Sequence, residues 1–223
     1  MPAIDLKPYF LTMNDVEESF DGKLDWPTFF GNDAPVEIDV GCGRGLFLFH
    51  ASAAHPQVNY LGIELDYKEA RRGAQRLQKR QTHNARVLGG DVFEAFRKFI
   101  QPHSVSAIHV YFPDPWWKRK HRGRRVFNDH FSDLAAGLIQ PGGLLHSWTD
   151  VEEYFGVISR LMDHHPLFEA MPTPVERTPQ DDMDYQTSYE RKKRQLGLPI
   201  YRGQWRRKLL ERETGETGAS GHQ

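Results

Sequence analysis

The stretch Val36-Glu37-Ile38-Asp39-Val40-Gly41-Cys42-Gly43-Arg44-Gly45 decides the fold of this chain. A short strand over residues 36–40 leads directly into glycines at alternate positions, and an apolar helix over residues 46–54 follows. Glycines let the chain turn tightly and let a ligand approach the backbone, while the start of the helix offers N–H groups to that ligand. This order of strand, glycine loop and helix is typical of the first unit of a ligand-binding parallel sheet.

Strands and helices alternate along the rest of the chain. The other predicted strands cover residues 58–63, 85–89, 105–112, 144–149, 168–171 and 200–205. The predicted helices between them cover residues 67–81, 92–100, 128–139 and 151–164. Strands separated by helices at this spacing pair in parallel. The sequence therefore predicts an α/β fold with a mostly parallel, seven-stranded sheet and helices on both faces.

The domain organisation follows from length and composition. The 223 residues include 26% charged and 39% hydrophobic residues, which is typical of a globular protein. We expect a single domain over residues 33–212, preceded by an N-terminal extension (1–32) and followed by a tail (213–223) that is predicted to be disordered. For the extension, ordering on RNA binding is one interpretation.

Several kinds of site and location are disfavoured. Cys42 is the single cysteine, so an intrachain disulfide and a multi-cysteine zinc site are excluded. His109, His121 and His146 show no metal-ligand spacing, and we expect no metal. No apolar run has the length of a membrane helix and no signal peptide is recognisable, so we expect a cytoplasmic protein without a membrane contact. A monomer is the expectation for its oligomeric state, with a homodimer as the alternative.

The net charge of −1 conceals three basic clusters. Residues 68–80 and 116–125 hold six cations each, and residues 191–212 hold nine. Clusters of this kind can focus positive potential on one face and attract a polyanion. For residues 68–80 taken alone, a solvated helix face is the favoured interpretation. For residues 116–125 we favour function, because two tryptophans, six cations and Gly123 do not make an amphipathic helix.

Acidic residues end three successive predicted strands. Asp39 precedes the glycine loop, where it suits a cationic ligand such as a sulfonium and repels a pyrophosphate. Glu64 is placed to accept hydrogen bonds from ribose hydroxyls, and Asp91 to meet an adenine. Together with Gly41 and Gly43 they predict a cofactor bound across the open edge of the sheet. The alternative is a simple strand–helix turn with surface carboxylates.

A second motif follows the predicted strand 105–112. Its sequence is Phe112-Pro113-Asp114-Pro115-Trp116-Trp117-Lys118-Arg119-Lys120-His121-Arg122. Two prolines fix the backbone around Asp114. A rigid carboxylate beside an aromatic wall can accept hydrogen bonds from N1–H and the 2-amino group of a guanine, and the basic run can hold phosphates. The alternative is a proline-rich turn with a solvated basic loop.

With these motifs the chain resembles the tRNA (guanine-N7-)-methyltransferases. The Phe-Pro-Asp-Pro-Trp run and the late segment Thr187-Ser188-Tyr189-Glu190-Arg191-Lys192 are specific to that family, and the likeness runs from about Val36 to Lys208. The resemblance implies a Rossmann-like class I methyltransferase fold with S-adenosylmethionine as methyl donor. It also implies tRNA as the partner, methylated at N7 of the variable-loop guanosine 46.

The resemblance assigns roles by position. Cofactor-binding roles fall on four carboxylates, Asp39, Glu64, Asp91 and Asp114, and Asp114 is also the implied catalytic residue. The implied substrate contacts are Lys118, Asp150, Thr187, Ser188, Tyr189 and Glu190. For Asp150 an N-cap of the following helix is an equal alternative. Thr187 and Glu190 also have the spacing of a capping box.

Two positions depart from the family pattern. Asp39 stands where the family has Glu, while Glu37 lies two residues back on the same strand face, so either could serve the cofactor. Trp117 replaces a proline and adds a stacking surface.

The implied chemistry needs no general base. Guanine N7 carries a lone pair and no proton, and Asp114 can stabilise the positive charge that develops on the ring. Three alternatives stay open: a methyltransferase for another nucleic-acid base nitrogen, a nicotinamide dehydrogenase, and a non-catalytic RNA-binding protein. Leu46 and Asp39 disfavour the dehydrogenase.

Overall fold

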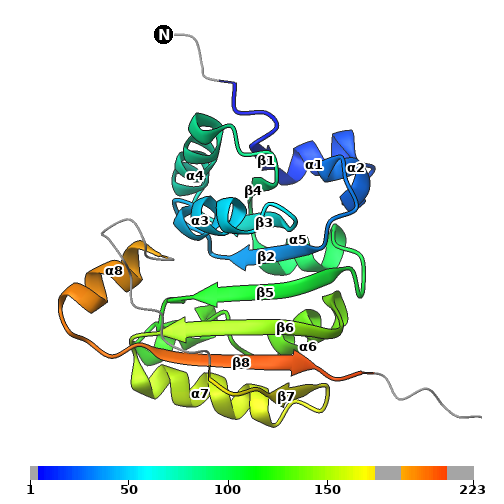
Figure 1. The fold of residues 1–223 in the computed structure, drawn as a ribbon. Helices are drawn as coiled ribbons and strands as arrows, with labels where there is room; N and C mark the ends of the chain where they lie inside the picture. Colours follow the sequence, from blue (N-terminus) through cyan, green and yellow to red (C-terminus); the bar gives the residue numbers. More distant parts are fainter. Residues whose placement is uncertain (1–4, 174–186, 210–223) are drawn as a thin grey trace, which may run out of the picture.

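The computed structural model describes residues 5–173 and 187–209. Within them, one eight-stranded sheet has the order β1-β4-β3-β2-β5-β6-β8-β7 (Figure 1). The strands are β1 (Phe10–Thr12), β2 (Val36–Val40), β3 (Asn59–Glu64), β4 (Ala85–Gly89), β5 (Val105–Tyr111), β6 (Ile139–Thr149), β7 (Phe168–Ala170) and β8 (Tyr201–Arg207). The strands from β1 to β6 in this order pair in parallel, and β8 is antiparallel to both neighbours. The predicted α/β class and mostly parallel sheet are confirmed.

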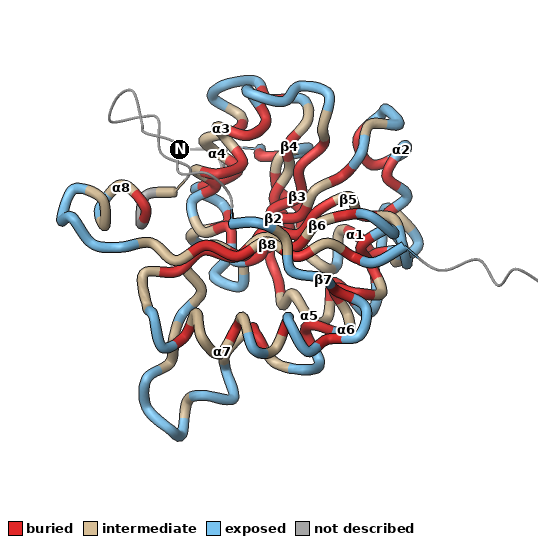
Figure 2. Tube along the Cα trace, turned by 60° about the horizontal axis from the view of Figure 1, so that its bottom comes forward, coloured by how far each residue is buried: buried red, intermediate tan, exposed pale blue. Residues whose placement is uncertain are grey.

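The helices cover both faces of the sheet. They are α1 (Met13–Ser19), α2 (Trp26–Phe30), α3 (Leu46–Ala54), α4 (Tyr67–Arg80), α5 (Val92–Lys98), α6 (Asp129–Leu138), α7 (Glu152–Asp163) and α8 (Ser188–Gln195), with a 3₁₀ helix η1 (Arg119–Arg124). Figure 2 shows α3 and α4 on one side of the buried strands and α5, α6 and α7 on the other. Helix α8 projects beside the sheet (Figure 1).

Two hydrophobic cores follow from this layering. Successive side chains of a strand point to opposite faces, so Tyr60 and Leu61 of β3 enter different clusters. Tyr60 packs with Leu48 of α3 and Leu77 of α4, whereas Leu61 lies in the larger core with helices α5 to α7. All of these side chains are at most 2% exposed. The smaller core thus holds α3 and α4 against the strands beside the glycine loop, and the larger core holds α5 to α7 on the other face.

The eighth strand comes from the N-terminal extension, so the predicted count of seven was one short. Phe10 pairs with Val87 and Thr12 with Gly89, which adds β1 to the edge of β4. A strand of three residues is too short to show a period of two, so no pattern in the sequence announced it. Thr12 also caps α1 through its hydroxyl, which accepts from the N–H of Asp15 at 3.2 Å.

Strand β6 begins five residues earlier than predicted. Pro141-Gly142-Gly143 predicts a turn, yet these residues lie within β6 as an irregularity in its pairing with β5. A Cβ atom on Gly143 would lie 2.6 Å from the carbonyl oxygen of Ser106, so only glycine fits this position beside β5.

Among residues 5–173 and 187–209, no helix has the length and apolar character required to cross a bilayer.

Candidate active site

A cavity of about 930 Å³ lies where β2, β3, β4 and β5 end. The chain passes from β2 to β3 and β4 on one side and returns to β5 on the other, so the sheet order reverses between β2 and β5. Ligands of open α/β sheets bind at such a reversal. The predicted residues Asp39, Glu64, Asp91 and Asp114 all line this cavity, together with Gly41, Gly43 and Thr187.

The glycine loop is fixed by its backbone. Gly41, Gly43 and Gly45 have φ angles of 72°, 51° and 63°, in the left-handed region where glycine carries no steric cost. The N–H of Gly41 donates to the carbonyl of Ile63 at 2.8 Å, which ties the loop to β3. Gly45 also packs closely against Gly73 of α4. A side chain at Gly73 would crowd the loop, because its Cβ atom would lie 3.3 Å from the Gly45 nitrogen.

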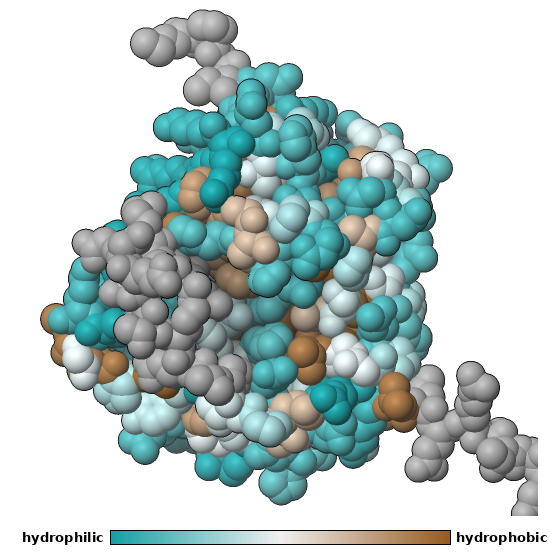
Figure 3. Space-filling model, in the orientation of Figure 1, coloured by the Kyte–Doolittle hydropathy of each residue, from teal (hydrophilic) through white to brown (hydrophobic). Residues whose placement is uncertain are grey.

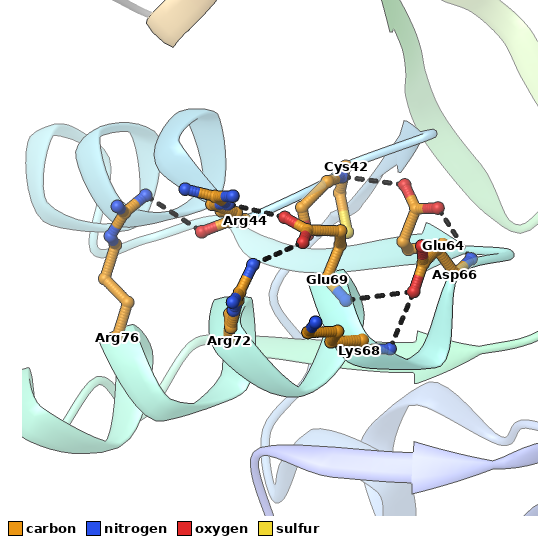
Figure 4. Close-up of polar contacts among 9 residues, drawn as sticks. Cys42, Arg44, Glu64, Asp66, Lys68, Glu69, Arg72 and Arg76 are labelled. Carbon is orange, nitrogen blue, oxygen red and sulfur yellow. Dashed lines mark hydrogen bonds and ion pairs between the residues drawn. The ribbon is translucent and has the colours of Figure 1, made fainter.

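Glu64 bridges the glycine loop and the turn before α4. Its Oε2 accepts a hydrogen bond from the N–H of Gly43 at 2.9 Å, and its Oε1 accepts one from the N–H of Asp66 at 2.8 Å (Figure 4). These bonds hold the carboxylate in one orientation at the cavity wall. Since each oxygen can accept more than one hydrogen bond, Glu64 can still receive two ligand hydroxyls.

Asp39 is buried, with 4% of its surface exposed. Burial, followed by the charge of Glu64, raises the pKa of Asp39 to about 8. An anion is therefore unfavourable here in the absence of a counter-charge, and a cationic ligand would favour the ionised form. Glu37 does not line the cavity: its Oε2 lies 2.8 Å from Nε2 of His109. Of the two carboxylates, the structure places Asp39 at the cavity.

Cys42 also lies in the glycine loop and lines the cavity. Its side chain is buried, and burial followed by the charges of Asp39 and Glu64 raises the pKa of the thiol well above its usual value. Those conditions disfavour a thiolate nucleophile. Its packing partner is Gly62, whose added Cβ would lie 2.7 Å from the sulfur.

Asp91 and Asp114 reach the cavity from different elements. Asp91 is the N-cap of α5, and its side chain accepts a hydrogen bond from the N–H of Glu94 at 3.0 Å. The same residue therefore caps the helix and lines the cavity. Asp114 is exposed at the mouth, in a loop where Phe112 and Trp116 have φ angles of 50° and 42°. Strained non-glycine residues of this kind persist only where surrounding contacts enforce them.

Two arginines supply contacts that enforce this loop. Arg125 donates from Nε to the carbonyl of Pro115 at 2.7 Å. The Arg124 guanidinium lies 5.2 Å from the centre of the Trp116 ring, within the range of a cation–π contact. Part of the basic run therefore shapes the Asp114 loop itself, while Lys118 is exposed at the start of η1 and outside the cavity wall.

The predicted substrate residues near α8 divide into two groups. Thr187 is the N-cap of α8, accepting from the N–H of Glu190 at 3.0 Å, and it also lines the cavity. Glu190 is buried and pairs with Nε of Arg194 at 2.9 Å. Ser188 and Tyr189 belong to α8, but their side chains lie outside the described residues.

Asp150 connects the end of β6 to α8. Its Oδ2 lies 2.6 Å from Nζ of Lys193, in an ion pair whose side chains are 22% and 24% exposed. The alternative of an N-cap is wrong, because α7 has Val151 at that position and no side-chain cap.

Tyr111 also lines the cavity, and it is not among the site residues predicted from the sequence. It belongs to no motif, and only its position at the end of β5 could have predicted its place at the cavity.

Comparison with known proteins gives the family. A family model described as "Putative methyltransferase" matches residues 33–203. A tRNA (guanine-N(7)-)-methyltransferase of Rhodopirellula baltica is 39% identical over 93% of this chain and 77% of the relative. Another, of Myxococcus xanthus, is 32% identical over 80% of this chain and 86% of the relative. The chain belongs to the tRNA (guanine-N7-)-methyltransferase family.

Solved structures confirm the methyltransferase fold. A 16S rRNA (adenine(1408)-N(1))-methyltransferase with cosubstrate SAM from Catenulisporales acidiphilia has a TM-score of 0.56 at 14% identity, over 84% of this chain and 92% of the other. The aminoglycoside resistance methyltransferase NpmB1 has a TM-score of 0.54 at 15% identity, over 88% and 94%. The predicted Rossmann-like class I architecture is therefore confirmed, and the eighth strand β1 adds to it.

Proposed function

We propose that this protein transfers the methyl group of S-adenosylmethionine to N7 of guanosine 46 in tRNA. The observation that carries the proposal is the meeting of Asp39, Glu64, Asp91 and Asp114 around one cavity. Four carboxyl groups at the reversal point of a sheet suit a cationic cofactor and a purine, and they repel a dinucleotide pyrophosphate. Membership of the family supports S-adenosylmethionine as donor and tRNA as acceptor.

The residues at the cavity fit the proposed cofactor. When bound, S-adenosylmethionine supplies an electrophilic methyl group on a sulfonium. Glu64 receives the ribose hydroxyls, since two backbone amides already fix its carboxylate. Asp91 faces the adenine, and Asp39 offers a buried carboxyl group that ionises beside positive charge.

Asp114 seats the guanine and stabilises the charge of the reaction. The N7 lone pair forms a bond to the methyl carbon while the carbon–sulfur bond breaks, leaving a neutral thioether and a cationic guanine ring. No proton leaves N7, so no general base is needed. A carboxylate held beside the purine lowers the energy of the positive charge as it appears.

The remaining predicted contacts hold the tRNA. Lys118 meets phosphate, and the N-terminal turn of α8 with Thr187, Ser188, Tyr189 and Glu190 contacts the nucleoside. Asp150 anchors α8 through Lys193. A tRNA substrate supports the cytoplasm as the site of action. We expect the enzyme to act as a monomer, and size-exclusion chromatography with light scattering tests that expectation.

The decisive experiment changes the acceptor atom. The enzyme is incubated with labelled S-adenosylmethionine and two tRNAs, one with guanosine and one with 7-deazaguanosine at position 46. The second tRNA carries C–H in place of N7 and keeps every Watson–Crick base-pairing group. We expect label only in the first tRNA, in 7-methylguanosine. Equal labelling of both tRNAs would rule out N7 of this nucleoside as the acceptor.

A further inference from the structure

The outer surface of α3 and α4 carries a second hollow, of about 540 Å³. It is lined by Phe49, Arg72, Gln75, Arg76, Lys79 and Arg80, none of which lines the cofactor cavity. Four of these six side chains are cations. We call this surface the α4 hollow. The surface over α4 is mostly hydrophilic (Figure 3).

The cations of the α4 hollow have few carboxylate partners. Arg72 pairs with Glu69 at 2.6 Å, and Glu69 is shared with Arg44 (Figure 4). Arg76 donates to the carbonyl of Arg44 at 2.8 Å, and Arg80 donates to the carbonyl of Phe49 at 2.7 Å. In the described part of the chain, no acidic side chain forms an ion pair with Arg76, Lys79 or Arg80. The hollow therefore keeps an excess of positive charge.

Burial makes the positive charge costly at one residue of the hollow. Burial, followed by the charge of Arg44, lowers the pKa of Arg76, which means that its charged form lacks compensation. An anion in the hollow would supply that compensation. The control surface is α5, on the opposite face of the sheet, where Lys98 pairs with Glu94 at 2.7 Å. On α5, Arg97 donates to the carbonyl of Phe93 at 3.2 Å, so each face has cations held by backbone carbonyls, but only the α4 hollow gathers four cations around one depression.

The hollow also contains an aromatic ring. The Arg80 guanidinium lies 4.1 Å from the centre of the Phe49 ring, and Phe49 is partly buried. The ring covers one face of the guanidinium and the Phe49 carbonyl takes a hydrogen bond from Nη1, which leaves the other N–H groups for a ligand. Planar guanidinium groups beside an aromatic surface suit the phosphates and riboses of RNA.

The α4 hollow stands beside the cofactor cavity. Arg76 bonds to Arg44 in the glycine loop, and the loop lines the cavity. Helix α4 and the basic helix α8 lie on the side of the molecule toward which β2 and β5 point (Figure 1). The hollow therefore begins beside the cavity at Arg76 and extends along α4 to Arg80, away from the cavity.

We propose that the α4 hollow binds backbone phosphates of the RNA substrate, on the side of the cavity mouth away from α8. This inference rests on the proposed function, which makes that RNA a tRNA. The contact anchors the body of the tRNA while the Asp114 loop and α8 hold the target nucleoside. It contributes to binding of the whole tRNA and leaves the reacting atoms untouched.

The test removes charge from the hollow of the full chain. The double variant Lys79→Gln/Arg80→Gln is compared with Arg97→Gln/Lys98→Gln on α5, which removes equal charge from the opposite face. The dissociation constant for a tRNA transcript is measured without cofactor over a series of KCl concentrations. We expect the α4 variant to bind about five- to tenfold more weakly at low salt, with a salt slope smaller by about 1–2, as for the loss of one or two phosphate contacts. The α5 variant should match the wild type.

A kinetic readout separates binding from chemistry. The α4 variant should show a raised KM for tRNA with kcat and the affinity for S-adenosylmethionine unchanged, because neither Lys79 nor Arg80 lines the cofactor cavity. Gln75→Glu provides a second variant, in which the new side chain is nearly equal in size to the original one. It places a negative charge among the cations and should weaken tRNA binding without the loss of any contact.

Two failures remain distinguishable. In the first, the wild type methylates tRNA, but both α4 variants bind tRNA as tightly as the wild type and with the same salt slope. The hollow is then not an RNA site, and it is either a solvated face or a docking surface for an acidic protein. If the wild type transfers no methyl group to tRNA, the proposed function fails. The binding data then still decide whether α4 contacts RNA.

Discussion

The two sides of the cavity are held by different forces. On the cofactor side, defined by residues 39–45 and the ends of β3 and β4, Glu64 accepts from two backbone amides and Asp39 is buried. On the substrate side, defined by residues 112–125 and α8, Asp114 and Lys118 are exposed, and the Asp150–Lys193 ion pair connects α8 to β6. Backbone hydrogen bonds resist salt, whereas exposed ion pairs are screened. The cofactor side is thus preformed, and the substrate side depends on charge.

The largest effect should come from Asp114, where the two sides meet. Asp114→Asn keeps the shape of the side chain and removes its charge, so the charge that develops on guanine loses its stabilisation. Removal of one such electrostatic partner costs about 10²–10³ in kcat. Single-turnover methylation with saturating tRNA and cofactor measures it. A variant that retains near wild-type turnover would remove Asp114 from the chemistry.

A change at Glu64 should break the preformed side. Glu64→Gln turns one of the two acceptor oxygens into an NH₂ group that faces the N–H of Gly43 or Asp66. Hydrogen bonds to a charged group contribute about 1.5–3 kcal/mol, so we expect cofactor affinity to fall by about 10- to 100-fold. Calorimetric titration with S-adenosylhomocysteine measures the affinity. The affinity for tRNA alone should not change, and a matched loss there would contradict the division into two sides.

The buried Asp39 should make stability depend on pH. Its folded-state pKa of about 8 lies above the usual value, so the folded protein binds more protons than the unfolded chain between about pH 4 and pH 8, and stability falls as pH rises through this window. Asp39→Asn removes this loss. Its melting temperature should therefore match that of the wild type at pH 4 and exceed it at pH 8. Each 1 kcal/mol of unfolding free energy gained should raise the melting temperature by about 2–4 °C. Equal pH profiles would contradict the burial argument.

The smallest effect is expected on the substrate side. A double-mutant cycle with Asp150→Asn and Lys193→Gln measures the coupling of this partly exposed ion pair by urea unfolding. We expect about 0.5–1 kcal/mol at low salt and less at high salt. The KM for tRNA should rise a few-fold in either single variant. A coupling energy that salt does not reduce would show that α8 is held by more than this charge pair.

Local patterns in the sequence determined most of the fold and the identity of the site. Short apolar runs predicted strands such as β2 and β4, the helical period of apolar residues predicted α6, and the glycine loop predicted the start of α3, because these signals depend on neighbours in the chain. The rule that parallel strands end at one edge placed Glu64, Asp91 and Asp114 together. The resemblance of the Asp114 run then supplied the family.

Only the tertiary structure decided several matters that involve distant partners. Asp39 and Glu37 share a strand face, and only the position of His109 on β5 shows that Glu37 is already paired. Asp150 finds Lys193 more than forty residues along the chain, although its local context suggested an N-cap. The basic run of α4 looked like a solvated face until Phe49 of α3 closed one side of it. Periodicity fixes which face a side chain occupies, but its partners, and therefore its charge state and function, are set by segments that meet only when the chain folds.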